Sequence, residues 1–183
     1  EPPIEGKFIW RNNKTLIFSP DALLPGDASF KGTINEKPLV QASGLSSFYG
    51  KKDFTFFTPP FTLKNVSPFY ERISGTNKIG LSAKLEFNYA VNPDELKNNF
   101  NITIAGKKFP VDVITDVDDR FITVSLGEIH ETDREDKGII EFGKDFYSSE
   151  TKTTIKEKEP FAFTIHRLSE LQIQSHEFNF HPV

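Results

Sequence analysis

The sequence of 183 residues contains no cysteine and no methionine, and it has no long apolar run. Without cysteine the chain can form no disulfide, no thiolate metal site and no cysteine nucleophile. No stretch approaches the roughly 18 to 20 consecutive apolar residues of a membrane-spanning helix. Because methionine is the residue at which translation starts, we expect the chain to begin inside a longer protein or after a processed leader.

Helix signals are equally scarce. The one good candidate is the segment 92–97, in which Asn92 can cap a helix and Pro93 suits the first helical position. Asp94 and Glu95 then complement the positive end of the helix dipole. This segment predicts one or two helical turns, and the segment 35–52 is expected to be a loop of weak pattern.

Strand signals are abundant, and 19 phenylalanines supply large rings that pack well on pleated surfaces. The longest pattern covers residues 80–91, where alternate positions are apolar. One face of this strand carries Leu81, Ala83, Leu85, Phe87, Tyr89 and Val91. In the segment 121–126, Ile122, Val124 and Leu126 form the expected core face.

Turn residues divide the rest of the chain into further strands. They are predicted at 7–10 and 15–18, which form a hairpin, and at 28–34, 53–58, 61–66, 101–105, 108–114, 138–142 and 153–165. Short strands with regular turn signals and without crossover helices predict an all-β fold, namely two tandem antiparallel β-sandwich modules. Pro59 and Pro60 remove two ladder donors and mark the predicted boundary. The expected parts are a module at 1–59, a sandwich at 60–166 and a tail, or the start of a following domain, at 167–183.

Two stretches of the sequence resemble a known family. The ordered string IEGKFIW (4–10), KTLIFSP (14–20) and LPG (24–26) is similar to the Ig-like module near the N-terminus of bacterial alpha-2-macroglobulins. Trp10, the only tryptophan, stands where that pattern has one. The segment LEFNYAVNPD (85–94) resembles the macroglobulin-like domain that follows in the same family.

The resemblance implies a structural role. Relatives are large extracytoplasmic protease traps, periplasmic or at the cell surface, in which a cut bait segment triggers rearrangement and a Cys–Gln thioester often captures the attacker. It implies that the partners are other domains of the same parent chain, that proteases are met through the full-length protein, and that any membrane attachment uses an N-terminal anchor outside this sequence. No catalytic residue and no cofactor is carried over. Trp10, Phe18 and Phe87 are expected to be structural, with Trp10 buried between sheets, and the module at 1–59 is expected to lack its first strands.

The sequence also offers a weak calcium candidate. Asp112, Asp116, Asp118 and Asp119 lie close together, and calcium prefers oxygen ligands. The segment lacks the spacing, glycine and closing glutamate of an EF-hand, and aspartate is common in turns for its own hydrogen bonds. Turn chemistry is therefore the favoured interpretation, and no other metal ligand set stands out.

Other function classes find less support. The net charge of −4 and the scattered lysines argue against nucleic acid as a partner. The sequence has no Gly-x-Ser-x-Gly elbow and no glycine-rich phosphate loop, so we expect no enzyme activity. The alternative function is a cell-surface Ig-like adhesin or a glycan-binding module. Its candidate platform is the aromatic set Phe54, Phe56, Phe57, Phe61, Phe69 and Tyr70, for which inter-domain or core packing is the favoured interpretation.

Overall fold

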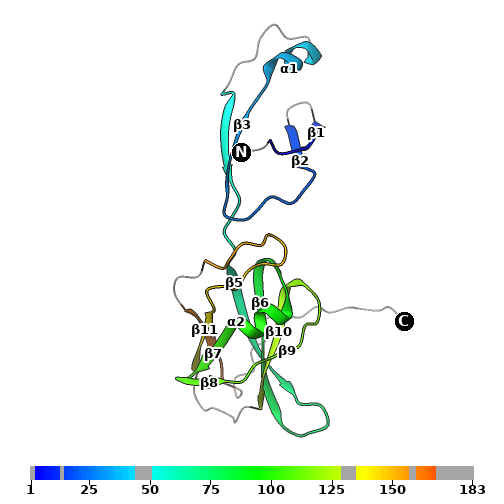
Figure 1. Cartoon of the computed structure of the whole chain (residues 1–183). Coiled ribbons are helices and arrows are strands. Elements are labelled where there is room, and N and C mark those ends of the chain that lie inside the picture. Colours follow the sequence, from blue (N-terminus) through cyan, green and yellow to red (C-terminus); the bar gives the residue numbers. More distant parts are fainter. Residues whose placement is uncertain (1–2, 13–14, 44–50, 129–134, 157–159, 168–183) are drawn as a thin grey trace, which may run out of the picture.

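The computed structural model describes residues 3–12, 15–43, 51–128, 135–156 and 160–167. Strands dominate, all their ladders are antiparallel, and the predicted all-β fold is confirmed. Residues from 61 onward form one β-sandwich, and two small sheets from the first 57 residues stand beyond one end of it (Figure 1).

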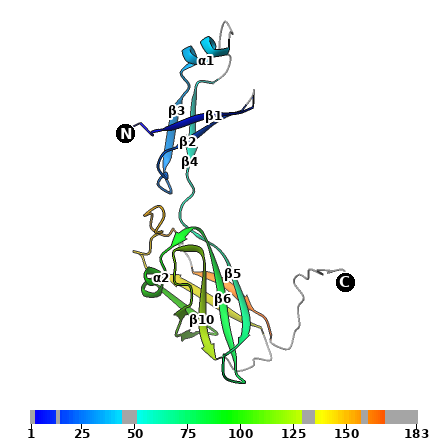
Figure 2. The same ribbon diagram turned by 90° about the vertical axis from the view of Figure 1, so that its right-hand side faces the viewer.

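The sandwich consists of two four-stranded sheets that face each other (Figure 2). The first sheet has the order β5 (Leu63–Arg72), β6 (Ile79–Val91), β10 (Asp119–Glu128) and β9 (Asp112–Val113). The second has the order β12 (Phe161–Ile165), β11 (Asp136–Phe142), β7 (Phe100–Ile104) and β8 (Lys107–Phe109). Side chains from the two inner faces meet between the sheets, as in other sandwiches.

The core follows the period-two pattern of the sequence. On β6, the predicted face is confirmed, because Leu81, Ala83, Leu85, Phe87 and Val91 are buried and Tyr89 packs against them. On β10, Ile122, Val124 and Leu126 are buried as predicted. The alternation therefore placed both central strands with the correct side chains inside.

The segment 108–114 is not the single strand that the sequence predicted. Lys107–Phe109 pairs with β7 in one sheet, whereas Asp112–Val113 pairs with β10 in the other. Pro110 lies between the two pieces and has no N–H to donate to either ladder. The chain crosses from one sheet to the other at this proline.

The end of the sandwich also differs from its prediction. The expected strand at 153–165 is confined to β12, and Ile155 forms only an isolated parallel bridge with Phe61. Of the predicted tail at 167–183, residues 168–183 lie outside the described residues.

Two helices occur. The predicted turn is α2 (Pro93–Asn99), and the Asn92 side chain accepts hydrogen bonds from the N–H groups of Asp94 and Glu95 at 3.0 and 3.1 Å. The loop predicted at 35–52 instead contains α1 (Glu36–Ser43). Asn35 accepts a hydrogen bond from the Lys37 N–H at 3.3 Å, so it acts as the cap. Pro38 lies in the first turn of α1. The N–H groups of a first turn have no intrahelical partner, so a proline there does not prevent the helix.

The N-terminal part contains two hairpins. β1 (Gly6–Asn12) pairs with β2 (Thr15–Pro20), and β3 (Ser29–Thr33) pairs with β4 (Asp53–Phe57). Each pair is a two-stranded sheet, and every buried core side chain among the described residues belongs to residue 61 or later. Apolar side chains in these hairpins are therefore only partly covered.

The prediction that Trp10 is buried between sheets is wrong. Its side chain is 58% exposed, and Phe18 on the paired strand is half-buried, whereas Phe87 is in the core as expected. The reason is that burial in a sandwich requires a second sheet over the first. Within the described residues no such sheet covers the Trp10 side of the β1–β2 hairpin.

Candidate functional site

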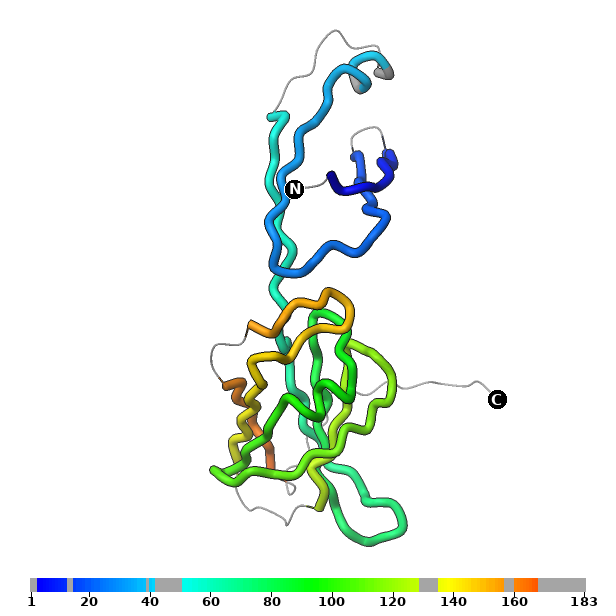
Figure 3. The backbone as a smooth tube through the Cα atoms, viewed as in Figure 1, coloured from blue at the N-terminus to red at the C-terminus, as the bar shows by residue number. Residues whose placement is uncertain are grey.

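The N-terminal hairpins meet the sandwich at one turn, residues 24–27, which we call the joint. Gly26 is buried there, next to the loop around residue 151 (Figure 3). A Cβ atom at Gly26 would lie 3.0 Å from Thr153 Oγ1 and 3.2 Å from the Tyr89 ring. The sandwich therefore approaches this turn closely enough that glycine is the residue that fits best.

Hydrogen bonds fix the joint from both sides. The Asp27 N–H donates to the Pro59 carbonyl at 3.0 Å, and Thr58 Oγ1 donates to the Pro25 carbonyl at 2.6 Å. Asp27 also forms an ion pair with Lys156 of the sandwich. Asp27 has a φ of 54°, in the left-handed region that aspartate tolerates better than most residues. The predicted boundary prolines thus lie inside a bonded junction.

A loop of the sandwich is held rigid beneath the joint. The buried Ser148 hydroxyl donates to the Ala90 carbonyl at 2.9 Å and accepts from the Glu150 N–H at 3.1 Å. Glu150 in turn accepts from the Ala90 N–H at 2.9 Å and pairs with Arg120 at 3.0 Å. These contacts tie the loop to the end of β6, so the surface that receives Gly26 is preorganised.

Tyr89 connects this loop to the joint. Its hydroxyl donates to the Pro59 carbonyl at 3.0 Å. Burial of the hydroxyl, and secondly the Glu150 carboxylate, raise the pKa of Tyr89 above the ordinary 10.0, while Arg120 acts in the opposite direction. The neutral, hydrogen-bond-donating form of Tyr89 is thus favoured at the joint.

Alkaline pH is expected to destabilise the protein through Tyr89. Because its pKa is higher in the folded state, the folded state binds this proton more tightly than the unfolded state does. The resulting stabilisation is complete below the ordinary tyrosine pKa and is lost as the pH rises through the folded pKa. Urea unfolding at neutral pH and above pH 10 should show a smaller alkaline loss for Tyr89→Phe than for the unaltered chain. Equal losses in the two proteins would contradict a role for Tyr89.

Besides the joint, the N-terminal hairpins have an apolar surface that could bind a ligand. Phe8 is 69% exposed, and Trp10 and Ile9 on the same strand are also exposed. Phe8 contacts Phe18 at a ring-centroid distance of 5.0 Å, and this pair lies on the Trp10 face of the β1–β2 hairpin. Several large apolar side chains on one small element exceed the scattered exposure that is normal for a monomer.

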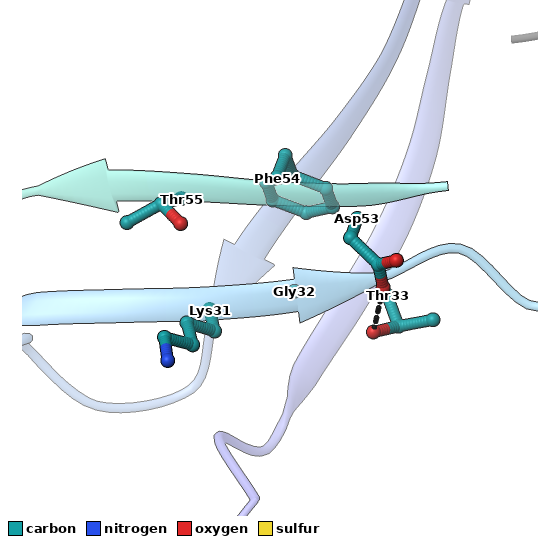
Figure 4. Close-up of a pocket in the computed structure, with 6 residues that line it drawn as sticks. All are labelled: Lys31, Gly32, Thr33, Asp53, Phe54 and Thr55. Atoms are coloured by element: carbon teal, nitrogen blue, oxygen red, sulfur yellow. Dashed lines mark hydrogen bonds between the residues drawn. The ribbon is translucent and has the colours of Figure 1, made fainter. Parts of the chain in front are cut away.

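The β3–β4 hairpin carries a shallow hollow (Figure 4). Phe54 covers Gly32 directly across the ladder, and Thr33 donates a hydrogen bond to Asp53 at 2.7 Å. Lys31 and Thr55 form its remaining side. The hollow is open and has a single carboxylate, so it offers no converging set of acid, base or nucleophile.

Two of the acidic residues proposed for calcium accept hydrogen bonds, and a third lies in a strand. Asp119 accepts a hydrogen bond from the Phe121 N–H at 3.1 Å, and Asp118 accepts from the Asn92 amide at 2.9 Å. Asp112 belongs to β9 and is paired with Ser125 in the ladder. In the part of the chain that the structure describes, no three or more histidine, aspartate or glutamate residues form a group that could hold a metal ion.

The aromatic residues proposed as a platform are separated. Phe61 is fully buried in the core, Phe54 and Phe57 are exposed on β4, and Phe69 is exposed on β5. Tyr70 donates a hydrogen bond from its hydroxyl to the His166 carbonyl at 2.8 Å. The six side chains therefore do not share one surface.

Sequence reasoning did not find the joint. The signal available for it is Leu-Pro-Gly-Asp at 24–27, a sequence typical of a local turn. A turn motif gives the local backbone conformation but not the distant residues that pack on it. Tyr89 and Lys156 come from elements far along the chain, and only their tertiary placement brings them to Gly26.

Comparisons with protein-family models, with curated proteins and with solved structures gave no match. Within the described ranges, no helix combines the length and the apolar character needed to cross a membrane.

Proposed function

We propose that this chain is a non-catalytic scaffold segment of an alpha-2-macroglobulin-like endopeptidase inhibitor, in which it holds neighbouring domains at a fixed angle. The observation that carries the proposal is the joint, where Gly26 is buried against the sandwich and Asp27 is bonded to both Pro59 and Lys156. Such a junction suits a segment whose task is to position other parts of a molecule. The order of the two resembling stretches supports the same family.

The proposal places the chain within a longer protein, so its test uses the product of the complete coding sequence. A trap encloses its protease, and enclosure blocks large substrates while small peptides still diffuse to the active site. We expect the complete protein to suppress endopeptidase cleavage of a protein substrate but not of a short chromogenic peptide. The same protein without residues 1–183 should lose that suppression. Equal inhibition of both substrates, or full trapping without this segment, would reject the proposal.

A second candidate is glycan binding, favoured by the exposed rings of Phe8, Trp10 and Phe57. Aromatic faces of this kind can stack on sugar rings. Because Trp10 is the only tryptophan and is largely exposed, its fluorescence reports directly on a ligand at the β1–β2 hairpin. Saturable quenching by an oligosaccharide would favour this function, and no change across a glycan panel would leave the scaffold function ahead.

A further inference from the structure

The outer edge of β4 has no strand beside it in the described structure. β4 pairs with β3 alone, and the two form a separate two-stranded sheet (Figure 1). A strand of this kind presents a row of main-chain N–H and C=O groups to whatever approaches.

The register shows which groups point outward. The Thr58 N–H donates to the Ala28 carbonyl at 3.0 Å, and the Ile34 N–H donates to the Lys52 carbonyl at 2.8 Å. Antiparallel ladders alternate between hydrogen-bonded and non-hydrogen-bonded pairs. The intervening residues of β4 that lie at non-hydrogen-bonded positions are Asp53, Thr55 and Phe57. Their N–H and C=O groups therefore face the free edge.

This edge lacks the usual protection against pairing. Several other edge strands of the protein carry it: β8 contains Lys107 and Lys108, β5 contains Pro68, and β1 contains Lys7 and Arg11. The β4 sequence DFTFF has no lysine, arginine or proline, and its ladder with β3 has no bulge. Phe57 is 73% exposed and Phe54 49% exposed. An apolar, regular edge strand is a site for pairing with another chain.

We propose that β4 pairs with β4 of a second copy of this chain, antiparallel and centred on Thr55. In that register Thr55 faces Thr55, and Asp53 faces Phe57 of the second copy. These are the residues whose main-chain groups face outward, so each facing pair exchanges both of its N–H···O bonds. The pairing is isologous, because the same strand contributes the same residues from both copies. It joins the two hairpins into one four-stranded sheet.

The side chains fit this register. Phe54 faces Phe56 of the second copy, and both lie on the face of the hairpin that already carries the stacked pair Phe30 and Phe56. Cross-strand aromatic pairs stabilise sheets. The only charged residue of the strand, Asp53, is opposite a phenylalanine. No like charges meet.

The expected association is weak. An aromatic side chain contributes roughly 150–250 Å² when fully buried, so the exposed parts of Phe54 and Phe57 supply only about 200–300 Å² per copy. Stable interfaces cover about 800 Å² per partner, and smaller ones belong to transient complexes. We accordingly expect a dimer that forms as the protein concentration rises rather than a permanent one.

Sedimentation velocity of the 183-residue chain over a range of concentrations tests the proposal. The unaltered chain should shift from monomer to dimer as its concentration rises. Thr55→Pro removes the outward N–H at the centre of the pairing but no hydrogen bond of the β3–β4 hairpin, and proline is tolerated on edge strands. This variant should stay monomeric at every concentration.

Lys31→Pro is the matched control. Lys31 is the cross-strand neighbour of Thr55 (Figure 4). Because this pair is not hydrogen-bonded, the Lys31 N–H points to the other edge of the same hairpin. The control should dimerise as the unaltered chain does. A chain that remains monomeric without substitution, or a Thr55→Pro variant that still dimerises, would overturn the proposal.

Cross-linking gives a readout that does not require proline. The chain has no cysteine, so Thr55→Cys and Lys31→Cys each introduce a single thiol. In the proposed sheet the two Thr55 positions are about 5.5 Å apart, whereas the two Lys31 positions are separated by three strand spacings, about 14–15 Å. A short bis-maleimide should link Thr55→Cys into dimers and leave Lys31→Cys unlinked. Failure to link Thr55→Cys, or equal linking of both, would exclude this register.

Discussion

Replacing Phe87 by alanine is expected to lower the free energy of unfolding by about 3–5 kcal/mol, the range for a large buried ring. Phe87 is 2% exposed, and its ring lies 5.7 Å from Phe61, 5.9 Å from Phe146 and 6.0 Å from Phe142, measured between centroids. Alanine would leave a cavity among three rings that other side chains hold in place. Urea unfolding followed by circular dichroism measures the change.

Phe8→Ala is the control for this prediction. It removes the same atoms from a ring that is 69% exposed and whose one aromatic neighbour among the described residues is Phe18. Substitutions at exposed positions away from special features usually change stability by less than about 0.5 kcal/mol. If Phe8→Ala destabilised the protein as much as Phe87→Ala, the N-terminal hairpins would contain a core that the described structure lacks.

Replacing Gly138 by valine is the second change with a large expected effect. Gly138 lies in β11, is buried, and faces Phe163 of β12 directly. A Cβ atom at this position would overlap the Phe163 ring, which is itself buried in the core. The ring would have to leave its position, and overpacking of this kind costs about 1–3 kcal/mol. Thermal or urea unfolding of the variant gives the value.

Two further variants make the cause of this effect testable. Ala162→Val adds the same kind of bulk at an exposed position of the neighbouring strand, and it should change stability little. In the double variant Gly138→Val with Phe163→Ala, the valine can enter the space of the ring. The double variant should then lose less stability than the sum of the losses in the two single variants, because the effects of substitutions at contacting residues are not additive. Strict additivity would show that Gly138→Val acts by a route other than the Phe163 ring.

The two parts of the chain differ in whether the apolar faces of their strands are buried. In the sandwich, each predicted apolar face has a second sheet opposite it, so Phe87 and Ile122 are fully covered. The N-terminal strands have patterns of similar quality, yet Trp10 and Phe8 remain exposed. Alternation specifies which side chains share a face, whereas burial requires another element over that face.

The scaffold proposal and the β4 pairing rest on different observations. The joint depends on Gly26 and its bonded neighbours, while the pairing depends on the free edge of the β3–β4 hairpin. If the 183-residue chain did not dimerise, the β4 pairing would therefore be rejected while the scaffold proposal, which depends on the joint, would be unaffected. Conversely, an absence of protease trapping would not affect the association of the 183-residue chain.

The amino-acid sequence by itself determined the fold class, the strands β6 and β10 at the centre of one sheet of the sandwich, and the capped turn at Asn92. These features depend on local chemistry: the period of two along a strand, and a side-chain oxygen that accepts from free N–H groups. Such signals are complete within about ten residues. The structure agrees with these signals because no distant contact overrides them.

The tertiary structure alone decided the exposure of Trp10, the change of sheet at Pro110 and the burial of Gly26. Each depends on what lies opposite in space, and residues far along the chain supply it. Gly26 meets Tyr89 and Lys156 is bonded to its neighbour Asp27, although neither partner is near in sequence. Whether a side chain is covered, bonded or free is thus a property of packing between elements, which a one-dimensional pattern does not contain.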